Sequence, residues 1–236
     1  METLLKTMQT RQSARVLYDP KKKIPKKDLE KILEAGRWAP TAHNMQNYEI
    51  IIVDDKKILE VIANIKNPIS LTFIRENYNQ LSFSKEELKE KGTGVLGTMF
   101  PPAWRKPDIK AEDITKDDHN DFMGKEIRSS SALAVVLYDS TKRAPASEND
   151  FLGAISLGCL MENMWLMASS LGIGFQILSA LSEGNIEKQL RKILNIPKNM
   201  KIAYSFRLGY PVISEKYLRV RRPVKRFAHM NGYVKK

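Results

Sequence analysis

Apolar segments alternate with helix-like segments along most of the chain. Tyr48–Val53 and Ala132–Tyr138 are almost continuously apolar and rich in β-branched residues, which is typical of strands buried on both faces. Phe175–Leu178 and Ile202–Leu208 predict two further extended segments. The sequences between them predict helices at residues 2–10, 26–39, 56–65, 84–91, 117–128, 151–171 and 185–194.

The helix predicted at residues 151–171 is apolar on most of its sides. Leu160, Met164 and Met167 share one face, while Trp165 lies on another. This pattern favours the central helix of a core. Polar and charged residues interrupt the stretch, so it does not predict a membrane span.

Residues 67–131 break the regular pattern. They combine a charged helical segment, a glycine-rich patch and several prolines. We interpret them as a helical lid inserted into a single domain that covers residues 1–236. Strands separated by helices predict a three-layer sandwich of the α/β or α+β class, with the strand order left open.

Composition and charge narrow the possible partners. The 236 residues are 42% hydrophobic, which is enough for one large core. The formal net charge of +12 favours an anionic partner, either nucleic acid or a phosphate-bearing cofactor. The lysines are scattered without the interleaved aromatic residues of a single-strand binder, so a solvated surface is the better interpretation for most of them. Cys159 is the single cysteine and no apolar leader is recognisable, so we expect a reducing, cytoplasmic location.

Several common catalytic motifs are missing or poorly placed. Gly92–Gly97 fits G-x-G-x-x-G, but it follows a charged helical segment, so it predicts a loop and not a dinucleotide fold. The three histidines, His43, His119 and His229, are far apart and predict no metal site. No Gly-x-Ser-x-Gly elbow occurs, which leaves hydrolytic chemistry without support.

Three short clusters are candidates for an anion and ring site. Arg11–Arg15 places two guanidinium groups and a hydroxyl at a helix end, a set that suits a phosphate monoester. Ala39–Asn47 supplies small and amide residues, which offer both donors and acceptors to a heteroaromatic ring. In an extended tail, Arg219 and Arg221 face the same way and could complete the anion site. Taken singly, each cluster is also compatible with an ordinary surface segment or capping loop.

Two of these clusters resemble the start of the nitroreductase family of FMN enzymes. Arg11, Ser13 and Arg15 match the Arg-x-Ser-x-Arg/Lys opening of that family. Residues 38–47 match its block Trp-Ala-Pro-Ser-x-x-Asn-x-Gln-Pro, with threonine in place of serine and asparagine in place of the final proline.

The resemblance continues towards the end of the chain. Gly172–Gly174 corresponds to the Gly-Leu-Gly block that follows the central helix in the family. Leu208–Pro211, followed by Arg219–Pro223, resembles the family ending. The resemblance lapses over residues 67–131, but four motifs in the same order make it specific.

The resemblance implies an FMN site. Its phosphate and ribityl chain would be bound by the arginines and Ser13, and its isoalloxazine ring would be surrounded by Pro40, Thr41, Ala42 and Asn44. The implied cofactor-binding residues are Arg11, Gln12, Ser13, Arg15, Pro40, Thr41, Ala42, Asn44, Gln46, Leu178, Ser179, Arg219 and Arg221. No catalytic side chain and no metal are implied, because the flavin carries the chemistry.

The resemblance also implies an architecture and a reaction. The family fold is an α+β three-layer α-β-α sandwich with a mostly antiparallel mixed sheet, usually in an intertwined homodimer with FMN sites at the interface. NADH or NADPH would reduce the flavin and leave before a nitroaromatic, quinone or similar acceptor is reduced, a ping-pong cycle. Two alternatives stay open: a basic nucleic-acid-binding protein, and a flavin-dependent dehalogenase-type relative on the same fold.

Overall fold

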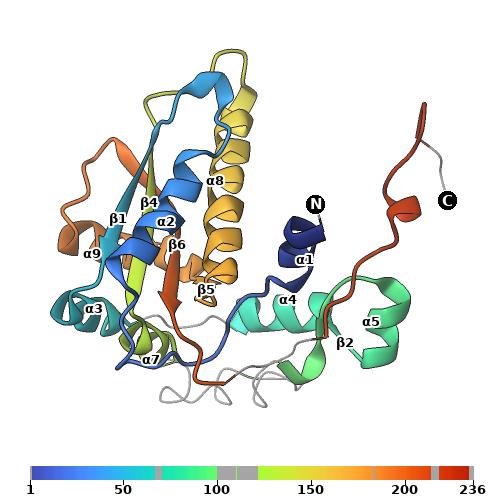
Figure 1. Ribbon diagram of the computed structural model, residues 1–236, viewed down its shortest axis with the longest axis horizontal. Helices are drawn as coiled ribbons and strands as arrows, with labels where there is room; N and C mark the ends of the chain where they lie inside the picture. Colours follow the sequence, from blue (N-terminus) through green and yellow to red (C-terminus); the bar gives the residue numbers. More distant parts are fainter. Residues whose placement is uncertain are drawn as a thin grey trace. The chain divides into compact units, whose positions relative to one another are not determined.

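The computed structural model describes residues 2–66, 71–99, 110, 122–182, 184–213 and 218–233 (Figure 1). The chain divides into two compact units, Met1–Asn67 with Asp121–Glu215, and Pro68–Asn120 with Lys216–Lys236. The first unit contains the main sheet and the second contains a short pair of strands. The interpretation of residues 1–236 as one domain with a lid at residues 67–131 stays a prediction.

The main sheet has four antiparallel strands in the order β1-β4-β6-β5. These strands are β1 (Tyr48–Val53), β4 (Ala132–Asp139), β5 (Gly174–Ile177) and β6 (Met200–Gly209). β4 and β6 lie at the centre, and most of their residues are buried. The four predicted strands are therefore confirmed, and β6 is longer than predicted.

Helices cover both faces of this sheet. They are α2 (Lys26–Arg37), α3 (Lys56–Ala63), α7 (Phe122–Ser129), α8 (Phe151–Ser170) and α9 (Gly184–Ile193), whereas α1 (Glu2–Thr10) contacts α8. Successive residues of β4 point to opposite faces. Ala134 and Val136 pack with α2 and α8, whereas Leu133 and Val135 pack with α3, α7 and α9. The predicted α+β three-layer sandwich with a mostly antiparallel sheet is confirmed for this unit (Figure 1).

The long helix α8 packs one face into the core, as its apolar pattern predicts, while its other sides are partly buried or exposed. Leu160, Met164 and Ala168 are fully buried against α2 and the sheet. A Cβ atom on Gly36 of α2 would lie 2.9 Å from Met164 Cγ, so this glycine lets the two helices pack closely. α8 is also the one described helix that is long and apolar enough to cross a membrane, a test that buried core helices pass as well.

Two local predictions are wrong. β1 was expected to be buried on both faces, but it lies at the edge of the sheet, where Glu49 is exposed and Val53 alone is buried. A β-branched run predicts a strand but not its position in the sheet. Gly92–Gly97 was expected to be a loop, yet Val95–Leu96 forms the strand β3.

The second unit pairs two short strands in parallel, β2 (Ser82–Phe83) with β3. The helix α4 (Leu71–Leu81) precedes them and was not predicted, because its apolar periodicity is weak. The helix α5 (Lys85–Lys91) confirms the prediction for residues 84–91, and a capping box between Ser84 and Glu87 begins it. The helix predicted at residues 117–128 corresponds to α7, although residues 117–121 lie outside the described part.

Candidate functional site

The Arg11–Arg15 segment follows α1 without regular secondary structure and runs along the edge of the main sheet. The Ala14 N–H donates to the Phe175 carbonyl of β5 at 3.0 Å, and Tyr18 forms an antiparallel bridge with Pro211. Ala14 and Tyr18 are buried. The chain is thus attached to the sheet on both sides of Arg15, whose side chain is exposed.

Two of the motif glycines make this attachment possible. Gly174 of β5 and Gly209 of β6 are register partners. A Cβ atom on Gly174 would lie 2.9 Å from Tyr18 Cε1, and one on Gly209 would lie 2.7 Å from Tyr18 Cγ. The absence of side chains at both positions therefore leaves the space that the buried Tyr18 ring fills.

Arg11 is held by α8. Its Nε lies 3.2 Å from Glu162 Oε1, and its guanidinium carbon lies 4.4 Å from the centre of the Trp165 ring. The Trp165 indole N–H donates to the Gln12 carbonyl at 3.3 Å. The side chains of Arg11, Gln12 and Ser13 are half-buried. The beginning of the segment therefore rests on α8, and its end rests on the sheet.

Arg207 of β6 lies against this segment with its side chain completely buried. Its Nη2 donates to the Val16 carbonyl at 2.6 Å, and its Nε and Nη2 donate to Gln176 Oε1 at 2.9 and 2.6 Å. The guanidinium carbon lies 4.0 Å from the centre of the Tyr18 ring. One side chain thus joins β6, β5 and the segment that carries Arg15.

Glu126 of α7 supplies the opposite charge. Its Oε1 lies 3.2 Å from Arg207 Nη2, and both side chains are almost completely buried. The Ser129 hydroxyl accepts from Arg207 Nη1 at 3.3 Å and from the Tyr18 N–H at 3.2 Å. Burial raises the pKa of the Glu126 carboxyl, while Arg207 and Arg15 act to lower it. Burial lowers the pKa of the Arg207 guanidinium, which nevertheless stays charged.

The loop Thr41–Gln46, the candidate for the ring surroundings, is held largely by contacts within itself. Thr41 Oγ1 accepts from the Gln46 N–H at 3.3 Å, and Asn44 Oδ1 accepts from Gln46 Nε2 at 2.8 Å. His43, Asn44 and Gln46 have φ angles of 52°, 54° and 45°. The left-handed conformation costs a non-glycine residue roughly 1–2 kcal/mol, so these contacts offset local strain.

One hydrogen bond links this loop to the core helix. The Ala42 N–H donates to Ser156 Oγ of α8 at 2.9 Å. Glu162 and Trp165, which hold the Arg11–Arg15 segment, lie six and nine residues further along the same helix. At the α-helical rise per residue, the two attachment points are about 9–14 Å apart along α8. The helix therefore fixes the spacing between the two candidate clusters of this unit.

The other predicted site residues lie outside the Arg11–Arg15 segment and the Thr41–Gln46 loop. The Leu178 side chain lies in the core, so a ligand could contact only its backbone, whereas the neighbouring Ser179 is exposed. Arg219 and Arg221 are exposed residues of the second unit. Their predicted role in completing the phosphate site stays a prediction.

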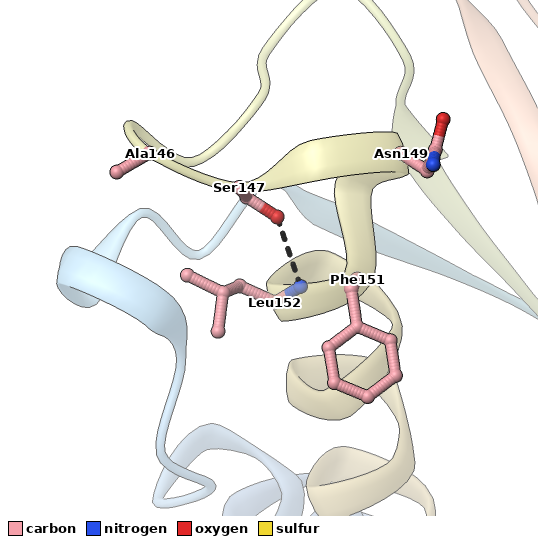
Figure 2. A pocket seen from close by; sticks show the side chains of 5 residues that line it. All are labelled: Ala146, Ser147, Asn149, Phe151 and Leu152. Carbon is pink, nitrogen blue, oxygen red and sulfur yellow. Dashed lines mark hydrogen bonds between the residues drawn. The ribbon is translucent and has the colours of Figure 1, made fainter.

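A pocket of about 560 Å³ opens at the start of α8. Figure 2 shows its lining and the hydrogen bond of 3.1 Å that the Leu152 N–H donates to Ser147 Oγ. The lining residues are Ala146, Ser147, Asn149, Phe151 and Leu152. None of them has a titratable side chain. The pocket lies one helical turn before Ser156, the attachment point of the ring loop, and offers contact surface but no acid, base or nucleophile.

No group of three or more His, Cys, Asp or Glu side chains that could hold a metal ion occurs among the described residues. His119 lies outside them. The expectation of a cofactor site without a metal therefore stays a prediction.

Comparison with known proteins agrees with these motifs. The sequence model of the nitroreductase family matches residues 8–210. The chain belongs to the nitroreductase family. This result confirms the resemblance and supports an oxidoreductase function. A relative from Archaeoglobus fulgidus, provisionally named NADH dehydrogenase/NAD(P)H nitroreductase, is 26% identical over 211 residues, covering 89% of this chain and 87% of the relative.

Solved structures show the same fold as this nitroreductase-family chain. An FMN-dependent nitroreductase from Clostridium difficile R20291 has a TM-score of 0.61 and 18% identity, covering 97% of this chain and 99% of that one. A nitroreductase with bound FMN from Bacteroides fragilis NCTC 9343 has a TM-score of 0.55 and 22% identity, with 98% of each chain covered. The predicted cofactor is therefore the one that these two proteins use or bind.

Sequence reasoning missed the residues that support the candidate site. Arg207, Glu126 and Gln176 form the buried network, and Trp165 and Ser156 hold the two clusters on α8. A signal existed for Arg207, which is a charged residue inside an otherwise apolar strand. A buried charge requires a partner, but its partners are distant in the sequence.

Proposed function

We propose that this protein is an NAD(P)H-dependent FMN oxidoreductase that reduces nitroaromatic, quinone or similar acceptors by a ping-pong mechanism. The observation that carries this proposal is the Arg11–Arg15 segment, which lies within the region matched by the family and is anchored on both sides of Arg15. NADH and NADPH are both candidate donors. We expect the protein to work in the cytoplasm.

The donors of the first unit fit the groups of FMN. Arg11 and Arg15 offer guanidinium groups, and Ser13 offers a hydroxyl, to a phosphate and a ribityl chain. The exposed amides of Asn44 and Gln46 provide donors and acceptors for the carbonyl and imide groups of the ring. The full proposed set is Arg11, Gln12, Ser13, Arg15, Pro40, Thr41, Ala42, Asn44, Gln46, Leu178, Ser179, Arg219 and Arg221.

The protein itself would bind and orient the cofactor and the acceptor. When bound, FMN supplies the redox chemistry between the nicotinamide donor and the acceptor. Arg15 would neutralise the phosphate, and the Thr41–Gln46 loop would set the polarity around the ring. The pocket beside Phe151 offers an apolar surface to a planar acceptor without any titratable group. No side chain is therefore proposed as a catalytic acid or base.

We further propose that two copies of the chain assemble through α1 and α8. These helices contact each other and carry exposed apolar side chains. Phe151 and Ile155 of α8 are 67% and 47% exposed, and Leu4 and Leu5 of α1 are 58% and 56% exposed. A second copy would remove this surface from water. Sedimentation at micromolar concentration should give a dimer, and a monomer would contradict this assembly.

A visible absorption spectrum of the purified protein tests the proposed function. We expect a bound-flavin spectrum that bleaches when NADPH or NADH is added without oxygen, and the two rates rank the donors. A subsequent nitroaromatic or quinone acceptor should restore the spectrum. A colourless protein that also fails to take up added FMN would contradict the proposal, and binding isotherms on nucleic acid across a salt series would then test the basic-protein alternative.

A further inference from the structure

Arg207 takes no direct part in the proposed function, yet it is the most completely buried charged residue among those described. It lies in the central strand β6, opposite Leu133 of β4 and Gln176 of β5. A buried ion pair contributes little net stability, because apolar residues of similar volume often replace one without loss. Stability alone therefore does not explain why the Arg207–Glu126 ion pair is buried here.

The hydrogen bonds of Arg207 point to that explanation. Nη2 lies 2.6 Å from the Val16 carbonyl and 3.4 Å from the Ala14 carbonyl. These two carbonyls belong to the residues on either side of Arg15. The Tyr18 hydroxyl also donates to the Ala14 carbonyl, at 3.2 Å. The backbone around Arg15 is therefore drawn towards the interior.

This arrangement fixes where the Arg15 side chain goes. Ala14 is buried and Arg15 is exposed. Because both flanking carbonyls bind the same buried guanidinium, rotation of the peptide units around Arg15 would break hydrogen bonds that the interior does not replace.

The chemistry of arginine suits this task better than that of lysine. A guanidinium group has five donors in one plane, whereas an ammonium group is a compact point charge with three. Arg207 uses its donors on Gln176, Glu126, Ser129 and the backbone of the segment at the same time. A lysine at this position could keep the ion pair with Glu126, but it could not donate hydrogen bonds in all of these directions at the same time.

We propose that Arg207 is a positioning residue, which holds the backbone on both sides of Arg15 so that the Arg15 guanidinium meets the phosphate of the cofactor. This inference rests on the proposed function, because it assumes that Arg15 binds that phosphate. Arg207 itself does not contact the cofactor in this assignment.

A comparison of two flavins tests the proposal. Riboflavin has the same ring as FMN but lacks the phosphate. The dissociation constants of both are measured on the full chain freed of flavin, for the wild type, Arg15→Met, Arg207→Lys and the double variant. Arg207→Lys should reduce the preference for FMN over riboflavin about tenfold and leave riboflavin binding unchanged. In the Arg15→Met background it should have no further effect on that preference.

Ser205→Ala is the matched control. Ser205 lies on the same face of β6 two residues before Arg207, is also fully buried, and has a hydroxyl without a hydrogen-bond partner among the described residues. Its removal should leave the preference for FMN unchanged. A loss as large as that of Arg207→Lys would show a general effect of the strand and overturn the proposal.

The outcomes separate this proposal from the function on which it rests. If the wild type binds neither flavin, or Arg15→Met keeps the preference for FMN, the proposed phosphate site is wrong and the inference falls with it. If Arg15→Met loses the preference but Arg207→Lys keeps it, the inference alone is overturned. It is also overturned if the losses add in the double variant, because Arg207 would then not act through Arg15.

Gln176→Leu keeps the proposal testable if Arg207→Lys does not fold. It removes the acceptor of two guanidinium hydrogen bonds, of 2.9 and 2.6 Å, but leaves the ion pair with Glu126. The preference for FMN should fall about threefold, since the guanidinium loses part of its orientation. An unchanged preference in a folded Gln176→Leu protein would overturn the proposal.

Discussion

The two candidate clusters of the first unit are held in opposite ways. The Arg11–Arg15 segment has little structure of its own and is fixed by the sheet, α8 and the buried Arg207. The Thr41–Gln46 loop is fixed mainly by its own hydrogen bonds and has one described hydrogen bond to α8, through Ser156. The first depends on the whole fold, whereas the second depends on its local sequence.

This difference has a consequence for how each cluster responds to change. A substitution in the buried network should destabilise the whole unit, because the same side chains form hydrogen bonds within the core and with the Arg11–Arg15 segment. A substitution in the Thr41–Gln46 loop should destabilise only the loop, because most of its hydrogen bonds connect residues that are close in the sequence. Four substitutions, ordered by the size of the expected effect, test this contrast.

The largest effect is expected for Arg207→Met. It leaves the Glu126 carboxylate buried without its partner and leaves the Val16 carbonyl without its donor. The free energy of unfolding should fall by about 3–5 kcal/mol, measured by urea denaturation. Adding Glu126→Leu should recover only part of this loss, because the carbonyl stays unsatisfied. Full recovery would mean that Arg207 serves the ion pair and not the segment.

Gly209→Ala should have the next largest effect. The new methyl group would overlap the buried Tyr18 ring, with Cγ at 2.7 Å. Overpacking of this kind should lower the free energy of unfolding by about 1–3 kcal/mol, measured by urea denaturation. In a Tyr18→Ala background the added methyl group should cost much less. An equal loss of unfolding free energy in both backgrounds would show that the Tyr18 ring does not fill the space beside this glycine.

Ser156→Ala should have a smaller and more local effect. It removes the acceptor of the Ala42 N–H, a hydrogen bond worth about 1 kcal/mol. Hydrogen exchange should quicken at residues 42–46 and stay unchanged at residues 14–18. Faster exchange in both segments would show that the two clusters are coupled more strongly than their contacts suggest.

The smallest effect is expected for Asp139→Asn, at the turn that supports the end of the ring loop. Hydrogen bonds from Thr141 hold the pKa of the Asp139 carboxyl at about 2, below its ordinary value of 3.8. The folded state therefore favours the carboxylate. This stabilisation is complete above about pH 5 and is lost as the pH falls towards 2. The free energy of unfolding, measured as a function of pH, should change differently in the wild type and in Asp139→Asn between about pH 5 and 2. Above about pH 5 the two curves should run parallel.

Much of the fold could be predicted because the relevant signals are local. The apolar run at Ala132–Tyr138 and the all-round apolar pattern of residues 151–171 correspond to β4 and α8 in the structure. β1 shows the limit of such signals. Its sequence resembles that of β4, but the order of strands puts it at the sheet edge, where it pairs with β4 alone among the described strands. The weakly periodic α4 was missed for the opposite reason, because little in its sequence distinguishes a helix from a loop.

For the site, the sequence by itself determined which residues are present and in what order. The two arginines of the first motif and the amides of the ring loop can be identified in the sequence, and with the glycine motifs they resemble the family, whereas the pairing of Gly174 with Gly209 is seen only in the structure. The tertiary structure decided what holds them. Arg207 binds the Val16 carbonyl, 191 positions earlier in the chain. Local periodicity carries no information about such a contact, because it forms only when the sheet, α7 and the first segment have come together.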